Sequence, residues 1–353
     1  MTPPSTFNVG TGRCGSTMLS NILREHPKIL SISEFFPYAV DIGGRVSQAF
    51  TKDLIDGKAF WQIIGTVTPR AGLMVKNDVT FAELIYPFKS PKSRFSSNTG
   101  VPAILNATLP HITSEYDLLF DEIHDEVIDR SPATISEHYQ YLFTWLQKRF
   151  NKELWIERSG GIFVLIKQLY NTFPNARYIH IVRDGRNTAL SISKHLGFRM
   201  FLLGNILSEK LGVDPYESKD RTNIDRLPLE LQKFLPEKFD RLAFLNYQLP
   251  LSQYGKLWSQ QIIDGLKILK KVPRERVLTI VYEDLLKDPQ TELQNLAEFL
   301  GQEFVDRTWI ETAAATVRQP RSSWQKLPQS DRSELIKACQ PGFEALNNFG
   351  ITY

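Results

Sequence analysis

Short apolar runs that end at turn residues alternate along this chain with segments in which apolar residues recur every three or four positions. The apolar runs predict four strands, at 7–9, 154–156, 177–182 and 276–281. The helical spacing predicts helices over 18–23, 162–170, 257–269 and 293–300. Because strands alternate with helices, we expect an α/β fold of three layers, with a largely parallel central sheet and helices on both faces.

Two stretches interrupt this alternation, at about 86–130 and 197–250, where prolines and glycines separate short apolar patches. Both are too long to be ordinary connections between a strand and a helix. We expect them to be insertions in a single domain spanning 1–353 that form a lid or a substrate pocket. Variable surface decoration is the alternative.

Composition narrows the class of protein without naming a function. Lys and Arg outnumber Asp and Glu by 42 to 39, and a net charge of +3 argues against binding nucleic acid through bulk charge. The two cysteines predict no disulfide framework, and the six histidines show no spacing typical of a metal site. No secretory signal or membrane-spanning apolar segment is visible, so we expect a cytoplasmic protein.

The most informative segment follows the first predicted strand, where Gly10, Gly12 and Gly15 precede an amphipathic helix. Glycines let a loop bend tightly and approach a ligand, and the N-terminus of the following helix attracts an anion. The spacing from Gly10 to Thr17 is that of a P-loop, but Ser16 stands where a nucleotide triphosphatase has lysine. The loop therefore suits a phosphate group but lacks the side chain that serves the terminal phosphates of ATP.

A second anion site is predicted after the strand at 177–182, where Arg183 lies at the strand's carboxyl end and a helix begins near Asn187. A guanidinium group there can bind phosphate through two hydrogen bonds, and Ser191 can face the same anion from the helix. A structural ion pair of Arg183 with Asp184 or another neighbour is the alternative. Two phosphate sites on one sheet indicate a nucleotide with phosphates at its 5′ and 3′ positions.

This pair of elements resembles the sulfotransferase family, which uses 3′-phosphoadenosine 5′-phosphosulfate (PAPS). The resemblance implies a P-loop NTPase-like sulfotransferase fold, in which the first loop holds the 5′-phosphosulfate. The loop residues implied are Gly12, Arg13, Cys14, Gly15, Ser16 and Thr17. It also implies that Arg183 and Ser191 hold the 3′-phosphate. A sulfuryl group carries less charge than a γ-phosphoryl group and needs no metal, so Arg13 can offset charge at the bridging oxygen.

Two further residues carry the chemistry in this resemblance. Arg13, the His26-Pro27 pair and Glu34 are similar to the branch that contains tyrosylprotein sulfotransferases and many bacterial enzymes, in which a catalytic glutamate lies 21 residues after the loop arginine. Glu34 is therefore expected to act as general base, with a solvated surface carboxylate as the alternative. Arg158 is expected to stabilise the transferring group, although the family often has a lysine followed closely by proline there. A helix-capping loop with a surface arginine is the alternative.

The resemblance extends weakly toward the C-terminus. Tyr282 is expected near the adenine, and Arg318 and Arg321 are expected to add to the 3′-phosphate site. The alternatives are a tyrosine at the edge of the core and a basic loop without function. His111, His124 and His138 remain as other choices for the base.

The function predicted from the sequence is transfer of a sulfuryl group from PAPS to an acceptor hydroxyl by in-line displacement, leaving 3′,5′-bisphosphoadenosine. The acceptor is expected to carry a hydroxyl group, and its identity stays open among a hydrophobic alcohol or lipid, a peptide tyrosine and a sugar. A hydrophobic acceptor is compatible with the apolar residues of the second insertion, which are otherwise core residues: Phe198, Phe201, Leu202, Phe244 and Tyr247. The sequence leaves the oligomeric state open. The alternative function is a P-loop kinase or nucleotide-binding protein with a degenerate loop.

Overall fold

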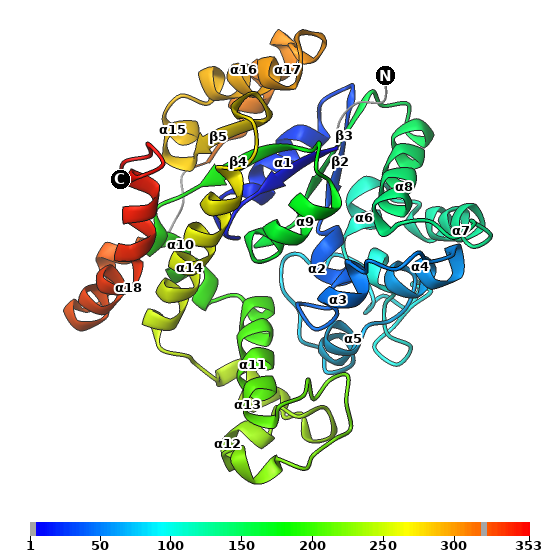
Figure 1. Ribbon diagram of the computed structural model, residues 1–353, viewed down its shortest axis with the longest axis vertical. Coiled ribbons are helices and arrows are strands. Elements are labelled where there is room, and N and C mark those ends of the chain that lie inside the picture. The colour runs from blue at the N-terminus through cyan, green and yellow to red at the C-terminus, as the bar shows by residue number, and fades with distance from the viewer. Residues whose placement is uncertain (1–4, 319–322) are drawn as a thin grey trace. The chain divides into compact units, whose positions relative to one another are not determined.

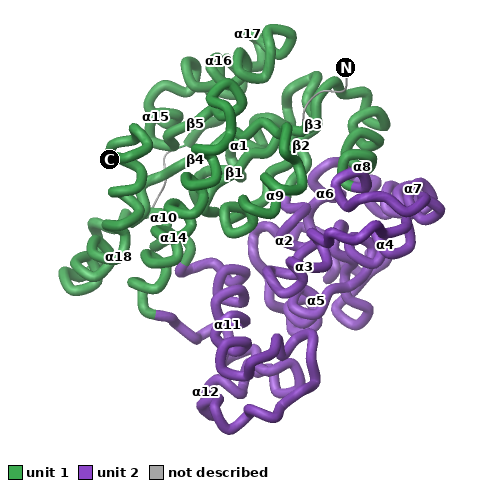
Figure 2. Tube along the Cα trace, in the orientation of Figure 1, with its two compact units in different colours: residues 1–33, 139–192, 250–353 green, residues 34–138, 193–249 purple. Residues whose placement is uncertain are grey.

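The computed structural model describes residues 5–318 and 323–353. The chain forms two compact units, each built from segments that are discontinuous in sequence (Figure 2). Unit 1 comprises residues 1–33, 139–192 and 250–353, and unit 2 comprises residues 34–138 and 193–249.

Unit 1 contains the strands and the helices that pack on them (Figure 1). Its strands are β1 (Thr6–Val9), β2 (Ile29–Ser33), β3 (Leu154–Arg158), β4 (Arg177–Val182) and β5 (Val277–Val281). Its α-helices are α1 (Ser16–Arg24), α9 (Ile166–Thr172), α10 (Gly185–Ser193), α14 (Leu251–Leu269), α15 (Tyr282–Lys287), α16 (Pro289–Leu300), α17 (Arg307–Ala314) and α18 (Gln329–Asn347), with α8 (Ile135–Arg149) crossing into it from unit 2. Short 3-10 turns lie at Ile162–Leu165, Arg274–Arg276, Gln302–Phe304 and Trp324–Lys326.

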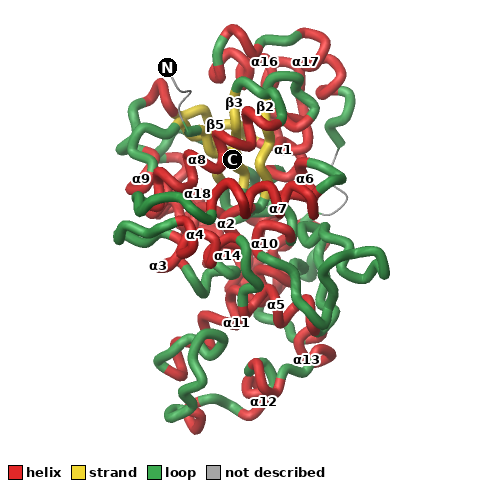
Figure 3. Tube along the Cα trace, turned by 90° about the vertical axis from the view of Figure 1, so that its right-hand side faces the viewer, coloured by secondary structure: helices red, strands yellow, loops and turns green. Residues whose placement is uncertain are grey.

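The five strands form one parallel sheet in the order β2-β3-β1-β4-β5. In Figure 3 the strands, drawn in yellow, lie together and helices and loops make up the other described parts of the chain. The chain leaves β1 through α1 toward β2 on one side, and leaves β4 toward β5 on the other. The order therefore reverses between β1 and β4, and open α/β sheets bind ligands at the carboxyl ends of strands at such a point.

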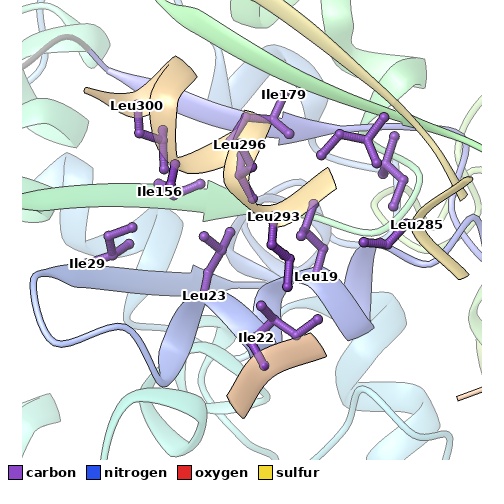
Figure 4. Packing of buried hydrophobic residues seen from close by; sticks show 14 of the residues in the cluster. Leu19, Ile22, Leu23, Ile29, Ile156, Ile179, Leu285, Leu293, Leu296 and Leu300 are labelled. Carbon is purple, nitrogen blue, oxygen red and sulfur yellow. The ribbon is translucent and has the colours of Figure 1, made fainter. Parts of the chain in front are cut away.

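Helices cover both faces of this sheet. On one face, leucines and isoleucines of α1 and α16 pack on Ile156 and Ile179 in a buried apolar cluster (Figure 4). On the other face, the ring of Phe7 packs against Phe173, and Phe163 stacks on His180. The predicted three-layer α/β arrangement with a parallel sheet is thus confirmed.

Four of the five strands match the predicted ones, and β2 is the one that was missed. After Ile29 and Leu30 its residues alternate between serine and isoleucine, and Ser31 and Ser33 lie on the face that α1 covers. All five residues are buried, and the hydroxyl of Ser31 is satisfied there by the hydroxyl of Ser20 on α1 at 2.8 Å. Serine at alternate positions does not produce the continuous apolar run typical of a buried parallel strand.

The described residues of unit 2 form helices and loops, and their β-structure is limited to one isolated bridge between Ile55 and Ala133. Its α-helices are α2 (Phe35–Ala39), α3 (Val46–Ala49), α4 (Gly57–Ile64), α5 (Pro69–Lys76), α6 (Thr108–Ile112), α7 (Tyr116–Val127), α11 (Leu196–Leu211), α12 (Leu229–Gln232) and α13 (Arg241–Asn246). Short 3-10 turns lie at Ala103–Leu105, Ile224–Arg226 and Pro236–Lys238. No helix among the described residues is long and apolar enough to cross a membrane.

A buried arginine joins the two segments of unit 2. Arg70 is 2% exposed, and its Nη2 donates to Asp214 Oδ2 at 2.6 Å while its Nη1 donates to the carbonyl of Ile42 at 3.0 Å. The backbone N–H of Arg70 donates to buried Asp41, and burial raises the pKa of that carboxyl against these stabilising hydrogen bonds. The segment before residue 138 and the segment after residue 193 are therefore linked by one polar cluster.

Candidate functional site

The glycine loop connects β1 to α1 at the carboxyl end of the central strand, as the sequence predicted. Gly12, Arg13 and Gly15 have positive φ angles of 77°, 54° and 101°. A Cβ on Gly10 would lie 2.7 Å from both the Cys14 sulfur and the carbonyl oxygen of Ile181. The first N–H groups of α1 have no acceptor within the helix, so the loop and the helix start present donors to an anion.

The two predicted anion elements are in direct contact within unit 1. Arg13 Nε donates to the hydroxyl of Ser191 on α10 at 3.2 Å. Arg183 Nη1 donates to the backbone carbonyl of Arg13 at 3.1 Å. The structure therefore brings the loop arginine together with both residues that the sequence assigned to the second site.

Arg183 lies buried at the carboxyl end of β4. Its side chain is 7% exposed, and within residues 5–318 and 323–353 it has no carboxylate partner and its Nε has no hydrogen-bond partner. The neighbouring carboxylate of Asp184 instead pairs with Arg186 and accepts from the backbone N–H groups of Arg186 and Asn187. The alternative of an Arg183–Asp184 ion pair is therefore wrong.

Tyr282 lies beside both elements. The Arg183 guanidinium lies 4.8 Å from the centre of the Tyr282 ring, close enough for a cation–π interaction. A Cβ on Gly15 would lie 2.3 Å from Cδ2 of the same ring, so the loop approaches the tyrosine as only glycine allows. Burial raises the pKa of the Tyr282 phenol, partly offset by the charge of Arg183.

The remaining loop residues differ in exposure. Cys14 is fully buried among apolar residues of the sheet and α1, and burial raises the pKa of its thiol. Cys14 is therefore a packing residue whose backbone is the part available to a ligand. Ser16 is 4% exposed, whereas Thr17 is exposed at the start of α1.

Arg158 ends β3, where its Cα pairs in register with Asn8 of β1 and with Ser33 of β2. The three side chains are buried on the sheet face that α1 covers. Asn8 is fully buried, and within the described chain neither its Oδ1 nor its Nδ2 has a hydrogen bond. No sequence motif identifies Asn8; its one signal is an asparagine inside a predicted strand next to the glycine loop.

Glu34 directly follows β2 and is the first residue of unit 2. It is 5% exposed, has a φ of 55° and precedes α2, so it is not the solvated surface carboxylate of the alternative interpretation. Within unit 2, the charges of Glu34 and Glu83 add to burial in raising the pKa of Tyr38. A carboxylate in such surroundings is poorly hydrated.

Of the two C-terminal arginines, Arg318 and Arg321, the structure describes only Arg318. Arg318 is exposed, and its guanidinium donates to the carbonyl groups of Ala315 and Val317 in its own segment. Arg321 lies outside the described residues. The chain after it is attached to α10, because the Trp324 N–H donates to Asn187 Oδ1 at 3.1 Å and the Trp324 ring lies 4.4 Å from the Arg186 guanidinium.

Of the histidines kept as alternative bases, His138 has a structural role. It is buried and stacked on Phe60, with its Nε2 2.7 Å from the carbonyl of Ile55. Within residues 5–318 and 323–353, no three His, Cys, Asp or Glu side chains are grouped so that they could hold a metal ion.

The family model described as the sulfotransferase domain matches residues 164–340, half of the chain. The chain belongs to the sulfotransferase family. The match contains Arg183, Ser191 and Tyr282, whereas the glycine loop lies before it. No curated protein sequence matches the chain.

Solved sulfotransferases are similar to this chain at low identity. The sulfotransferase domain of the Synechococcus PCC 7002 olefin synthase is 16% identical over 96% of this chain and 94% of its own, with a TM-score of 0.45. The sulfotransferase domain from the curacin biosynthetic pathway is 15% identical over 99% and 98%, with a TM-score of 0.45. Sulfotransferase STF9 from Mycobacterium avium is 18% identical over 99% and 78%, with a TM-score of 0.45.

Proposed function

We propose that this sulfotransferase takes its sulfuryl group from PAPS and delivers it to an acceptor hydroxyl by in-line displacement. The observation that carries the proposal is the contact of Arg13 with Ser191 and Arg183 beside a glycine loop without the P-loop lysine. One anion subsite would lie in the loop after β1 and the other after β4, and these two strands are neighbours in the sheet. Their separation on neighbouring strands suits a nucleotide with 5′ and 3′ groups.

The residues present fit such a donor. The buried Nε of Arg183 lacks a partner among the described residues, which is costly unless a ligand accepts from it. Arg183 and Ser191 would hold the 3′-phosphate, and Gly12 through Thr17 would hold the 5′-phosphosulfate with backbone N–H groups and Arg13. Tyr282 would contact the adenine. The bound donor would supply an activated sulfuryl group with a good leaving group, and the chemistry needs no metal.

The remaining chemistry falls to the chain's own side chains. Glu34 would accept the proton of the acceptor hydroxyl as that oxygen attacks sulfur, a role that its 5% exposure favours by limiting hydration. Arg13 would offset negative charge on the bridging oxygen. Arg158, also buried, would stabilise charge on the transferring group.

The acceptor is proposed by class only, as a small molecule with a hydroxyl group and an apolar body. Aromatic residues in 197–250 suggested the apolar acceptor. One of them, Phe244, is fully buried in the core of unit 2 and packs near Phe234. Phe244 is therefore a packing residue. The partly buried Tyr247, which contacts the ring of Phe234, remains a candidate for contact with an apolar acceptor.

Two measurements test the proposal. 3′,5′-Bisphosphoadenosine should raise the thermal unfolding temperature of the protein more than ATP with Mg²⁺ does, because the second subsite is occupied only by a 3′-phosphate. The opposite order would favour the P-loop kinase alternative. Turnover with labelled PAPS across a panel of hydroxyl acceptors then identifies the acceptor.

Glu34→Gln should retain affinity for the bisphosphate while turnover falls about 10²- to 10⁴-fold, the usual contribution of a general base. The matched control is Glu83→Gln, which removes the other carboxylate that acts on Tyr38 and should stay near the wild-type rate. Unchanged turnover in Glu34→Gln would remove Glu34 as the base.

A further inference from the structure

Helix α11 carries a single charge in its apolar first half, because Arg199 is the only charged residue between Leu196 and Leu207. Arg199 is 6% exposed, and its Nη1 donates to the carbonyl oxygens of Phe244 and Leu245 at 2.8 and 2.7 Å. These carbonyl groups lie in the last turn of α13, where backbone oxygens have no partner within the helix. One role of Arg199 is therefore to cap α13.

This cap uses only one corner of the guanidinium of Arg199. Both hydrogen bonds come from Nη1, whereas Nε is buried and has no hydrogen-bond partner within residues 5–318 and 323–353. The N–H groups of Nε and Nη2 are parallel on one edge of a guanidinium, and that edge matches the two oxygens of a carboxylate. A buried donor without an acceptor is costly, so an anion that binds this edge is favoured more than it would be at a solvated arginine.

The charge of Arg199 is only partly balanced by its neighbours. Its hydrogen bonds within the described chain go to carbonyl groups, and the C-terminus of a helix offers about half an elementary charge. Arg70, also buried in unit 2, instead donates to the carboxylate of Asp214 at 2.6 Å. Arg183, the proposed receptor for a phosphate, likewise donates to a carbonyl group and has a buried Nε without a partner among the described residues. The surroundings of Arg199 thus match those of Arg183 more closely than those of Arg70.

A chain of contacts inside unit 2 connects Arg199 with the proposed base. The charge of Glu34 acts on Tyr38, whose hydroxyl donates to the backbone carbonyl of Glu83 at 3.1 Å. The carboxylate of Glu83 accepts from His195 Nε2 at 2.7 Å, and the carbonyl of His195 accepts from the N–H of Arg199 at 3.1 Å. The proposed base and the first turn of α11 therefore belong to one connected part of unit 2.

We propose that Arg199 binds a carboxylate of the acceptor through its Nε and Nη2 edge, so that the acceptor is a hydroxy acid. The proposal rests on transfer of a sulfuryl group to an acceptor hydroxyl and narrows the class of acceptor. It makes Arg199 a specificity-determining residue, because an uncharged analogue of the same shape cannot pair with the buried guanidinium.

The test compares hydroxy acids of increasing chain length with the methyl ester of each, as kcat/KM of the intact chain with PAPS. In the wild type an acid should exceed its ester about ten-fold, as one hydrogen bond to a charged group allows. Arg199→Met should bring this ratio close to one. Arg199→Lys keeps the charge without the two parallel N–H groups and should give an intermediate ratio.

The control is Arg241→Met, which removes an exposed positive charge from α13 and should keep the wild-type ratio. Thermal unfolding of each variant shows whether it is folded. If loss of the α13 cap unfolds Arg199→Met, the comparison in the wild type and in Arg199→Lys decides the question, and an unchanged ratio in Arg199→Lys contradicts binding through the Nε and Nη2 edge.

The inference is overturned if no acid exceeds its ester in the wild type, if the preference persists in folded Arg199→Met, or if the protein binds 3′,5′-bisphosphoadenosine but turns over no hydroxy acid. If the wild type does not bind the bisphosphate, the proposed donor is wrong, which is a separate result. The affinities of the acids and the esters, measured by calorimetry, then test Arg199 by themselves.

Discussion

Replacing Gly15 by alanine would test the close packing of the glycine loop against the ring of Tyr282. Gly15 has a φ of 101°, and a left-handed conformation costs an L-residue about 1–2 kcal/mol. The new Cβ would lie 2.3 Å from Tyr282 Cδ2, whereas two carbon atoms pack best at about 3.5 Å, so the ring must move by roughly 1 Å. Overpacking of this kind costs about 1–3 kcal/mol, and we expect a total loss of about 2–5 kcal/mol in the free energy of unfolding.

Gly350→Ala is the matched control for the backbone cost. Gly350 has a similar φ of 93°, but a Cβ there would have no heavy atom within 4 Å. In chemical denaturation, Gly350→Ala should therefore lose less free energy of unfolding than Gly15→Ala. The difference between the two losses is the cost of displacing the Tyr282 ring. Because that ring contacts Arg183, Gly15→Ala should also weaken binding of 3′,5′-bisphosphoadenosine, while Gly350→Ala should not. Equal stability of the two variants, together with wild-type affinity in both, would refute the reasoning.

Two further predictions concern buried charge. Burial lowers the pKa of His180 to about 3. Between pH 6.5 and 3 the unfolded state therefore binds a proton that the folded state does not, and the free energy of unfolding decreases as the pH is lowered. The decrease in the free energy of unfolding from pH 7 to pH 5, measured by chemical denaturation, should be smaller in His180→Phe than in the wild type by about 2 kcal/mol. An equal decrease in the two proteins would contradict the pKa of His180. Arg70→Met leaves Asp214 without its ion-pair partner and should cost about 3–5 kcal/mol in thermal unfolding. Lys89→Met, which removes the exposed pair with Asp78, should change stability little, and a similar loss in both variants would contradict the importance of burial.

The sequence predicted the architecture well where apolar residues run continuously. β4 was predicted at its observed limits, Arg177–Val182, because a parallel strand covered on both faces needs apolar residues at nearly every position. β2 was missed because its serines find partners on α1, a tertiary contact that no local pattern reveals. The single domain with two insertions remains a prediction beside the two units described above.

The candidate site was predictable to the level of residue type. The glycine spacing and the arginine after β4 identified two anion elements, but not that Arg13 lies against both Ser191 and Arg183. That contact depends on β1 and β4 being neighbours in the sheet, which follows from strand order. The buried amide of Asn8 escaped notice because an isolated polar residue in a strand has no motif to identify it.

The discontinuity of the two units has a consequence for how the chain folds during synthesis. The sheet of unit 1 is complete only when β5 has been made, at residues 277–281, and the partner of Arg70 arrives only with Asp214. Arg70 and Asp214 are 144 residues apart in the sequence, so the charge of Arg70 is paired only after that length of chain has been synthesised. Contacts between such distant positions close large loops, which slows folding and leaves incomplete chains with unpaired surfaces. Neither unit is one continuous stretch of chain: all of unit 2 has been made only at residue 249, and unit 1 also needs the segment from residue 250 onward.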